Sequence, residues 1–410
     1  MAPALFRART VTWMVWVIAS LFYAYQYVLR VMPNIMLNDI MGRFSIDAAT
    51  FGQFSGIYYI GYSLMHLPVG IMLDRYGPKK VMSACILLTI IGLTPLIFAS
   101  NWMFPVIGRL LVGIGSSAAI LGLFKVIRMA FKEEQFSRML SLSVTIGLIG
   151  AIYGGGPVNY MLAKFGYETV LYLFGILGLI LALITYWIVP DVKIPSQGTV
   201  LSDVKEVLSN SRVVLCCIFA GLMVGPLEGF ADVWGTAFLK YSCNFDGTLA
   251  ATLPSLIFIG MCFGAPILNL IAEKVFRNYL LTIIGAALVM VLGFTLLLNC
   301  SWTATLVSLN FVIIGMCSAY QILAIYKAST YVPEHKAGLT TALANMIIMV
   351  FGYLFHSAIG GIVSAMGGPN TPHALIYGIG VIPIALCLGA CGFIGLLIRE
   401  NRLKTQKDLT

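Results

Sequence analysis

The chain has 410 residues, of which 60% are hydrophobic and only 10% are charged, and its formal net charge is +9. Soluble domains carry about 25% charged residues, so this composition excludes an ordinary soluble domain. The basic residues lie in short loops between apolar stretches rather than on one soluble face, which also excludes a nucleic-acid-binding domain.

The apolar residues form about a dozen stretches, each close to the roughly 20 residues that a helix needs to cross a bilayer. These stretches lack the alternating polarity of barrel strands, and a lipid-facing backbone must satisfy its own hydrogen bonds. We therefore predict an all-α membrane protein with twelve transmembrane helices in two six-helix bundles. The predicted spans are residues 11–36, 48–72, 79–100, 103–128, 138–161, 168–190, 212–240, 248–271, 278–299, 302–327, 338–365 and 373–398.

The distribution of lysine and arginine orients these spans. With an inside N-terminus, 20 of the 25 basic residues fall on the inner side, and only Arg43, Lys164 and Lys240 fall outside. Basic loops remain in the cytoplasm. Both termini are therefore predicted to be cytoplasmic, in a multi-pass protein of a bacterial inner membrane. The first apolar stretch is too long for a signal-peptide core, so helix 1 is expected to be retained.

A polar stretch in the middle of the chain separates two halves of six helices each. It contains Pro195, Gly198 and an amphipathic segment at 200–208. A linker between equal helical halves is typical of repeat-built transporters. The predicted domains are a bundle at 1–190, a cytoplasmic linker at 191–211, a second bundle at 212–398 and a cytoplasmic tail at 399–410, with a monomer as the expected state.

Predicted helix 1 carries an unusual polar face. Tyr23, Gln26 and Arg30 are three and four residues apart and share one side of the helix, with Tyr27 beside them. A polar, aromatic and cationic face does not belong against lipid, so we expect it to line a central cavity and to bind substrate. The planar guanidinium of Arg30 suits a carboxylate or a phosphate.

Predicted helix 2 ends in a segment rich in charge and glycine. Residues 70–80 resemble the loop 2–3 signature of the major facilitator superfamily, G-x-x-x-D-R-x-G-x-[KR]-[KR]. The resemblance implies the major facilitator fold and an inner gate in which the acid pairs with neighbouring bases, while the first glycine allows close helix approach. A basic loop that only sets topology is the alternative. The matching residues are Gly70, Asp74, Arg75, Gly77, Lys79 and Lys80.

The second half echoes this segment. Residues 269–277 repeat the acid–base pair as Glu273 and Lys274, although Asn269 replaces the first glycine. The inner turn at 132–138 is likewise echoed at 333–338. Such internal similarity indicates a duplicated unit.

Helix 4 contains a membrane-embedded arginine, and helix 2 contains a histidine. Arg109 with Gly113 and Gly115 resembles the superfamily motif R-x-x-x-G-x-G, which implies a structural or proton-coupling role. An arginine that snorkels to the outer surface is the alternative. His66 can titrate in the cavity, with a purely structural histidine as its alternative.

The glycine-rich segment of helix 5, residues 147–157, resembles a motif of drug/proton antiporters. It departs from that motif after Pro157, which argues against a drug exporter. We therefore expect these glycines to serve close helix packing.

Helix 7 carries two acids, Glu228 and Asp232, four residues apart on one face. Two close carboxylates in a low dielectric favour holding a proton, as proton coupling requires. Helix 7 is the repeat partner of helix 1, and aligning Arg30-Val-Met-Pro with Asp232-Val-Trp-Gly places an acid where helix 1 has its arginine. A zwitterion placing its carboxylate at Arg30 and its ammonium at an acid is one hypothesis, and a direct salt bridge that closes the outer gate is the other.

The remaining candidates are weaker. Polar residues in helices 10 and 11 are lesser candidates for substrate contact, namely Tyr320, Gln321, Asn345 and His356. Most of the nine cysteines lie in apolar stretches, where they act as small hydrophobes, although Cys243 and Cys300 fall near outer loops and can pair. Without Cys/His ligand spacing or a nucleophile–base set, no metal, cofactor or enzymatic activity is expected.

These features favour a proton-coupled symporter of a small zwitterionic or anionic metabolite, such as an amino acid or a small peptide. Residues 22–33 resemble the amino-acid and siderophore transporters of intracellular bacterial pathogens, and organic-anion members of the superfamily carry an arginine in helix 1. The alternatives are a siderophore or drug exporter working by proton antiport, a membrane sensor that does not transport, and a lipid carrier.

Overall fold

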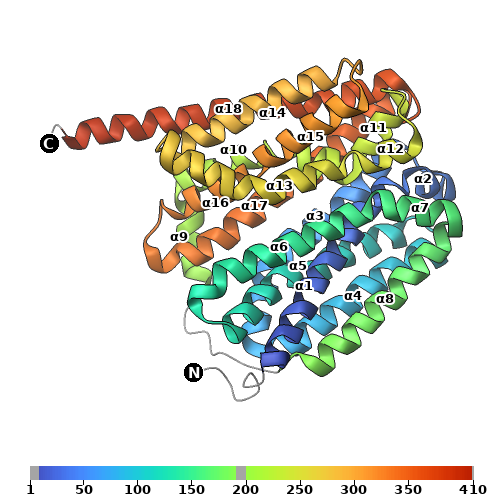
Figure 1. The fold of residues 1–410 in the computed structure, drawn as a ribbon, viewed down its shortest axis with the longest axis horizontal. Coiled ribbons are helices and arrows are strands. Elements are labelled where there is room, and N and C mark those ends of the chain that lie inside the picture. The colour runs from blue at the N-terminus through green and yellow to red at the C-terminus, as the bar shows by residue number, and fades with distance from the viewer. Residues whose placement is uncertain (1–8, 191–199, 409–410) are drawn as a thin grey trace. The chain divides into compact units, whose positions relative to one another are not determined.

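The computed structural model describes residues 9–190 and 200–408, and all regular structure within these ranges is helical. The chain divides into two compact units between residues 198 and 199 (Figure 1). Twelve helical segments of the described ranges are long and apolar enough to cross a membrane. The predicted all-α fold with twelve spans is therefore confirmed.

The first unit contains six spans and one short helix, α2, between the first two spans. Helix α1 passes into the single 3₁₀ turn η2 at Pro33, and the fifth span is made of α6 and α7, which meet at Gly155. The elements are α1 (Arg9–Val31), η2 (Met32–Asn34), α2 (Leu37–Phe44), α3 (Ala48–Tyr76), α4 (Pro78–Phe98), α5 (Met103–Ala130), α6 (Glu133–Gly154), α7 (Gly156–Phe165) and α8 (Tyr167–Ile188).

The second unit also contains six spans, several of which are interrupted. Its elements are α9 (Val200–Ser209), α10 (Ser211–Gly221), η3 (Gly225–Trp234), α11 (Gly235–Tyr241), α12 (Gly247–Thr252), α13 (Ser255–Leu270), η4 (Ile271–Val275), α14 (Tyr279–Leu297), α15 (Ala304–Ser318), α16 (Tyr320–Ser329), η5 (Glu334–Lys336), α17 (Ala337–Ala365) and α18 (Pro372–Asp408). Here η3 and η4 are π-helical segments.

The same helix pairs pack against each other in both units. In the first unit α3 packs on α5, α4 on α8, and α1 on α6. In the second unit the corresponding spans do so: α13 packs on α15, α14 on α18, and α10 on α17. This recurrence is the packing counterpart of the duplicated unit that the sequence motifs indicate.

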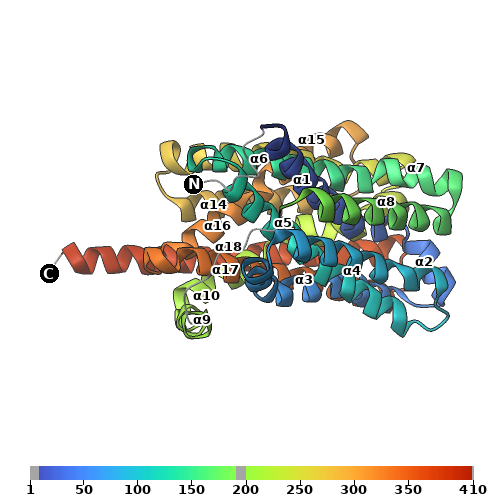
Figure 2. The same ribbon diagram turned by 90° about the horizontal axis from the view of Figure 1, so that it is seen from below.

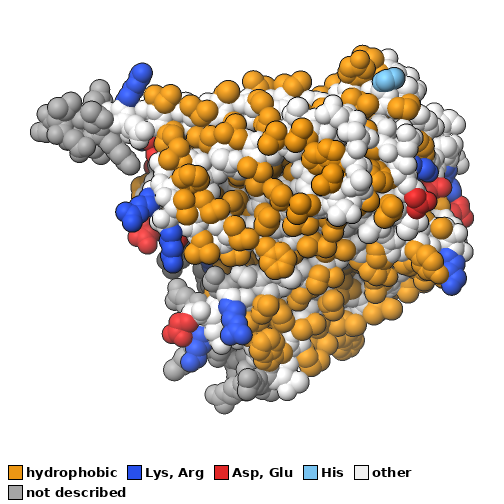
Figure 3. Space-filling view, turned by 45° about the horizontal axis from the view of Figure 1, so that its top comes forward, with side chains coloured by type: hydrophobic (Ala, Val, Ile, Leu, Met, Phe, Trp, Pro, Cys, Tyr) orange, Lys and Arg blue, Asp and Glu red, His pale blue; other side chains and the backbone are white. Residues whose placement is uncertain are grey.

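Charged and apolar side chains separate on the surface. Figure 3 shows hydrophobic side chains over most of the visible face, with lysine, arginine, aspartate and glutamate near its two ends. Large apolar residues such as Leu64, Trp187 and Ile384 are strongly exposed. In water this much exposed apolar surface would be unfavourable, whereas a bilayer solvates it.

The last helix continues well past its predicted end at residue 398. Helix α18 continues through Asp408, beyond the neighbouring helices of its own unit (Figures 1 and 2). Apart from Leu403, residues 399–408 are polar, which ended the predicted span, but they contain no glycine or proline and are mostly good helix formers. Most of the predicted tail is therefore a helical extension of the twelfth span.

The predicted linker is partly helical. Its amphipathic segment forms α9, while residues 191–199 lie outside the described residues. Lys336 forms ion pairs with Asp203 at 3.8 Å and with Glu206, which ties α9 to the turn before α17. The hydrogen bond to Glu206 raises the pKa of Lys336, and burial opposes this only in part.

Two loops of the second unit are joined by a disulfide. Cys243, which follows α11, is bonded to Cys300, which lies between α14 and α15, with 4.7 Å between the two Cα atoms. The pairing that the sequence left open is thus present.

Candidate functional site

The polar face of α1 is buried inside the first unit. The Tyr58 hydroxyl donates a 2.7 Å hydrogen bond to Gln26 Oε1. The Tyr58 ring also lies under the Arg109 guanidinium, 4.8 Å from its centroid. Gln26 and Arg109 are only 2% and 4% exposed. Helices α1, α3 and α5 therefore meet in one polar network.

Arg30 lies at the end of this network against two aromatic rings. Its guanidinium carbon is 5.1 Å from the ring centroid of Tyr27 and 5.2 Å from that of Tyr59. Tyr23 packs edge-on against Tyr27 at 5.2 Å. Arg30 is 7% exposed, so its charge is largely desolvated. The faces of the two tyrosine rings stabilise the buried cation through cation–π contacts.

Arg109 supports the backbone from which Arg30 projects. Its Nη1 donates to the carbonyl of Leu29 at 2.7 Å, and its Nη2 donates to the carbonyl of Arg30 at 2.9 Å. Pro33 has no N–H, so it cannot pair with the Leu29 carbonyl four residues earlier. The guanidinium thus replaces a lost helical hydrogen bond. Because Arg109 is buried, the alternative of a snorkelling arginine is wrong.

The glycines of helix 5 let α6 approach α1. A Cβ on Gly150 would collide with the backbone of Ala24, and one on Gly147 would meet the ring of Tyr23. These positions therefore require glycine for packing, as the sequence analysis expected. The ring of Tyr23 is held against α6 by this fit.

His66 is buried on α3, two turns after Tyr58. Its ring lies 4.7 Å from that of Tyr62, which stacks in turn on Tyr58 at 5.9 Å. Tyr58, Tyr62 and His66 are four residues apart, so they form one row along α3, and Tyr58 joins this row to Gln26 of α1.

Span 7, which carries the two acids, is not a regular helix. After Gly221 the α-helix stops, and residues 225–234 form a π-helix. Pro226 lacks an N–H, and the Val224 carbonyl accepts hydrogen bonds from both Leu227 and Glu228. Such π-helical segments are rare and often mark functional sites, as do discontinuous spans in transporters.

Both acids of this π-helix are buried in the second unit. Glu228 and Asp232 are each 1% exposed. Gln321 Nε2 donates to Glu228 Oε1 at 3.4 Å. The neighbouring Tyr320 hydroxyl donates to the carbonyl of Ala220, near the end of α10, at 2.7 Å. The interrupted spans 7 and 10 therefore meet where each is broken.

The two candidates on α17 differ in burial. His356 is almost fully buried at 1% exposure, whereas Asn345 is only half-buried. Phe355, the neighbour of His356, packs against the π-helix, because a Cβ on Gly225 or Gly229 would meet its side chain. Helix α17 therefore lies against η3 at the level of His356.

The signature segment of the first unit forms an acid–base pair. Lys125 on α5 pairs with Asp74 near the end of α3 at 2.5 Å. Gly77, with a φ of 84°, ends α3, and Pro78 begins α4. Lys79 lies over the ring of Tyr186 at 4.6 Å, while Arg75 and Lys80 are exposed. No described atom lies within 4 Å of a Cβ placed on Gly70, so the expected close approach there is wrong.

The second-half copy of the segment is arranged differently. Glu273 and Lys274 are exposed on η4, and the Tyr279 hydroxyl donates to Glu273 at 3.4 Å. The turn is closed by Arg277 with a positive φ of 49°, and Asn278 caps α14 by accepting hydrogen bonds from Leu280 and Leu281.

Tyr58, Tyr59 and the interruption of spans 7 and 10 were not predicted from the sequence. The four-residue spacing of Tyr58, Tyr62 and His66 was a usable signal for an aromatic row on one face of helix 2. Pro33 and Pro226 were signals for the breaks in spans 1 and 7. No comparable signal marks Ala319, where α15 ends, because alanine is the best helix former.

A model of the Major Facilitator Superfamily matches residues 10–357 of the chain. A curated relative, "Probable anion transporter 4, chloroplastic" of Oryza sativa subsp. japonica, is 28% identical over 36% of the chain and 26% of its own length. "Sodium-dependent phosphate transport protein 1, chloroplastic" of Arabidopsis thaliana is 23% identical over 44% of the chain and 36% of its own length. The chain thus matches only about a quarter to a third of these relatives' lengths.

Solved structures match over nearly the whole chain. A crystal structure of a point mutant of the nucleoside transporter NupG superimposes with a TM-score of 0.78, covering 93% of this chain and 99% of that one at 15% identity. At this identity the likeness concerns the fold alone.

Proposed function

This chain belongs to the Major Facilitator Superfamily, and on that premise we propose that it carries a small organic anion or zwitterion, such as an amino acid or a small peptide, by proton-coupled symport. Membership makes it a multi-pass secondary transporter that binds a small molecule within the membrane, and not an enzyme. The observation that carries the substrate class is Arg30, buried in α1 with its guanidinium against two tyrosine rings.

Arg30 favours an anionic group for a physical reason. A planar guanidinium forms two parallel hydrogen bonds to a carboxylate, a geometry that a lysine ammonium cannot match. Gln26, Tyr23 and Tyr27 supply further polar and aromatic surface on the same helix. The similarity to a plant anion transporter is in keeping with this class of substrate.

Glu228 and Asp232 are proposed to carry the coupling proton, and one of them to meet a substrate ammonium group. Both are buried at 1% exposure on a π-helix, where protonation removes the cost of a buried charge. Gln321 holds Glu228 through an amide hydrogen bond, which stays possible in either protonation state because the amide offers both a donor and an acceptor. Arg109 and His66 are proposed to support this cycle from the first unit.

We propose that both termini face the cytoplasm of a bacterial inner membrane. Two independent features support this orientation. Most basic residues fall on the side of the predicted inner loops. The disulfide of Cys243 and Cys300 joins loops predicted to be outside, where an oxidising compartment maintains such bonds. We further propose two inner-gate elements: the segment 70–80 with the Asp74–Lys125 pair, and Glu273 with Lys274. The proposed state is a monomer.

Ligand-dependent thermal stabilisation tests the substrate class. The purified protein is heated with amino acids, small peptides, organic acids, sugars, siderophores and phosphate, at two pH values. A compound that binds only the folded state raises the melting temperature. We expect stabilisation by a carboxylate or zwitterion, its loss in Arg30→Ala, and its retention in Arg43→Ala, which removes an exposed arginine of α2.

Three outcomes contradict the proposal in different ways. Stabilisation only by bulky siderophores or apolar drugs would make the chain an exporter. A carboxylate hit that survives Arg30→Ala would remove Arg30 from the site. Binding that does not differ between the two pH values would argue against a proton as the coupling ion.

A further inference from the structure

The internal repeat can be aligned residue by residue from helix contacts. In the first unit a Cβ on Gly113 of α5 would strike the carbonyl oxygen of Tyr58 on α3. In the second unit a Cβ on Gly315 of α15 would strike the carbonyl oxygen of Ile257 on α13. A second pair of close approaches has the same sequence spacing from the first in both units. It consists of Gly61 against Leu110 and Gly260 against Val312.

This register identifies equivalent charged residues. Tyr58 and Ile257 differ in residue number by the same amount as Asp74 and Glu273, so these two acids are equivalent. Gly113 and Gly315 likewise differ by the same amount as Lys125 and Lys327, so these two lysines are equivalent. Both units therefore have an acid near the inner end of the second helix and a lysine near the inner end of the fourth.

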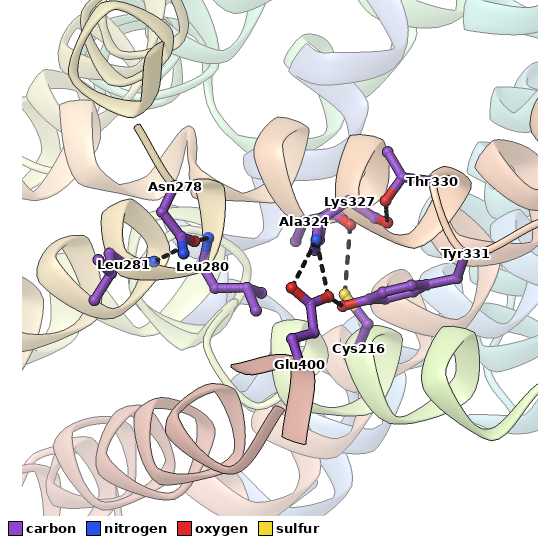
Figure 4. Close-up of polar contacts among 9 residues, drawn as sticks. All are labelled: Cys216, Asn278, Leu280, Leu281, Ala324, Lys327, Thr330, Tyr331 and Glu400. Atoms are coloured by element: carbon purple, nitrogen blue, oxygen red, sulfur yellow. Dashed lines mark hydrogen bonds and ion pairs between the residues drawn. The ribbon is translucent and has the colours of Figure 1, made fainter. Parts of the chain in front are cut away.

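The two lysines nevertheless have different partners. Lys125 pairs with Asp74, as the repeat would suggest. Lys327 instead pairs with Glu400 on the extension of α18, 2.9 Å from Oε1 and 3.1 Å from Oε2 (Figure 4). The repeat would lead one to expect Lys327 to join span 10 to span 8. In the second unit it joins span 10 to span 12 instead.

Glu400 is held from a second direction. The Tyr331 hydroxyl donates to Glu400 Oε1 at 2.6 Å, and Figure 4 shows Tyr331 and Lys327 converging on the carboxylate. Burial, and then the hydrogen bond to Glu400, raise the pKa of Tyr331, so the phenol remains a donor at neutral pH. Lys327 and Glu400 are each only 18% exposed, so removing one partner leaves a poorly solvated charge.

Lys327 lies at the end of a short helix whose other end is at the candidate site. Helix α16 begins after the break at Ala319, and its first two residues are Tyr320 and Gln321. Gln321 reaches Glu228, while Lys327 lies six residues later, about 9 Å along the helix. The break at Ala319 separates α16 from α15. A contact that fixes the Lys327 end of α16 therefore also restrains Gln321 at its other end.

We propose that Lys327, Glu400 and Tyr331 are positioning residues that fix α16 against α18 and so hold Gln321 at Glu228. This inference rests on the proposed function for its effect on substrate, but the contact itself can be tested without any ligand. The extension of α18 is then part of the transport machinery rather than a tail.

Cys216 is a natural reporter of this contact. It is fully buried on α10, and its Sγ donates to the carbonyl of Ala324 on α16 at 3.6 Å (Figure 4). The rate of its reaction with a small maleimide is measured in a chain that keeps the disulfide. In that chain the other free cysteines, Cys85, Cys217, Cys262, Cys317, Cys387 and Cys391, are replaced by alanine.

We expect Lys327→Gln to raise the labelling rate of Cys216 about tenfold, since the inner end of α16 then opens more often. Charge reversal, Lys327→Glu with Glu400→Lys, should return it towards the parent rate. Glu273→Gln, the repeat-equivalent acid without this contact, is the matched control and should leave it unchanged. An unchanged rate in Lys327→Gln, or an equal rise in Glu273→Gln, overturns the proposal. Should Lys327→Gln not fold, Tyr331→Phe, which loses only the phenolic hydrogen bond, takes its place.

A double-mutant cycle on substrate affinity distinguishes a positioning role of Lys327 from a purely stabilising one. If Lys327 acts through Gln321, then Gln321→Ala combined with Lys327→Gln should weaken binding no more than Gln321→Ala alone. Additive losses would reject the positioning role. If the parent protein binds none of the panel compounds, the proposed function fails, while the Cys216 labelling still decides whether the contact holds α16.

Discussion

Arg109 donates a 2.7 Å hydrogen bond to the carbonyl oxygen of Leu29, the group that Pro33 leaves without its helical partner. The motif arginine of helix 4 therefore completes the C-terminal end of α1 and fixes the backbone of Arg30 as well. Its side chain is used as a structural donor, which explains how a charged residue is tolerated at 4% exposure.

Replacing Arg109 by alanine should destabilise the protein, because it leaves two buried carbonyl oxygens without donors, at about 1–3 kcal/mol each. We expect a lower melting temperature in detergent and weaker substrate binding through the displaced Arg30. Arg128→Ala, an exposed position on the same helix, is the control. A melting temperature equal to that of the parent would show that these two hydrogen bonds do not stabilise the protein.

Replacing Glu228 by glutamine should uncouple transport from the proton gradient. Glutamine keeps the size and the contact with Gln321 but cannot take up a proton. We expect gradient-driven accumulation in proteoliposomes to be lost while counterflow exchange persists. Glu334→Gln, at an exposed position on η5, should retain both activities. Accumulation by Glu228→Gln at the parent rate would assign coupling to another residue, with Asp232 the first to examine.

Gly150→Ala should destabilise the first unit, because its Cβ would overlap the backbone of Ala24 and push α6 away from α1. Overpacking of this kind costs about 1–3 kcal/mol. Gly175 of α8 has open space around it, so Gly175→Ala should be neutral or slightly stabilising. Thermal unfolding of the two variants makes the comparison. Equal melting temperatures would mean that α1 and α6 separate without cost.

Loss of the disulfide should lower stability by about 2–4 kcal/mol, since the bond restricts the unfolded chain. Replacing Cys243 and Cys300 by serine and reducing the parent protein should give the same lower melting temperature. Cys387→Ser, at an exposed free thiol, should have no effect. A parent protein insensitive to reductant, with free thiols by mass spectrometry, would contradict the bond.

The number of spans, the polar face of helix 1 and the acids of helix 7 could be predicted because each depends on nearby residues. Apolar length defines a span, and three- and four-residue spacing defines a face. What could not be predicted depends on distant partners. Nothing local to Gln26 indicates that Tyr58 will meet it, and Gly70 matched a signature without making the contact that the signature implies.

The partner of Lys327 could not be predicted from the sequence, for a similar reason. Glu400 lies in a polar segment that hydropathy assigns to a tail, yet the segment remains helical and brings the carboxylate to span 10. The break at Ala319 carries no proline or glycine, so packing alone determines it. Local pattern thus predicts the elements, while interruptions and long-range ion pairs require the folded chain.

The bond between Cys243 and Cys300 turns the segment between them into a closed covalent ring that contains α13 and α14. In the proposed topology this ring passes through the bilayer twice, and its inner turn holds exposed Arg277. A single protease cut at that turn would open the ring without releasing either fragment. The cleaved protein would migrate as one species on a gel until a reductant separated its two parts.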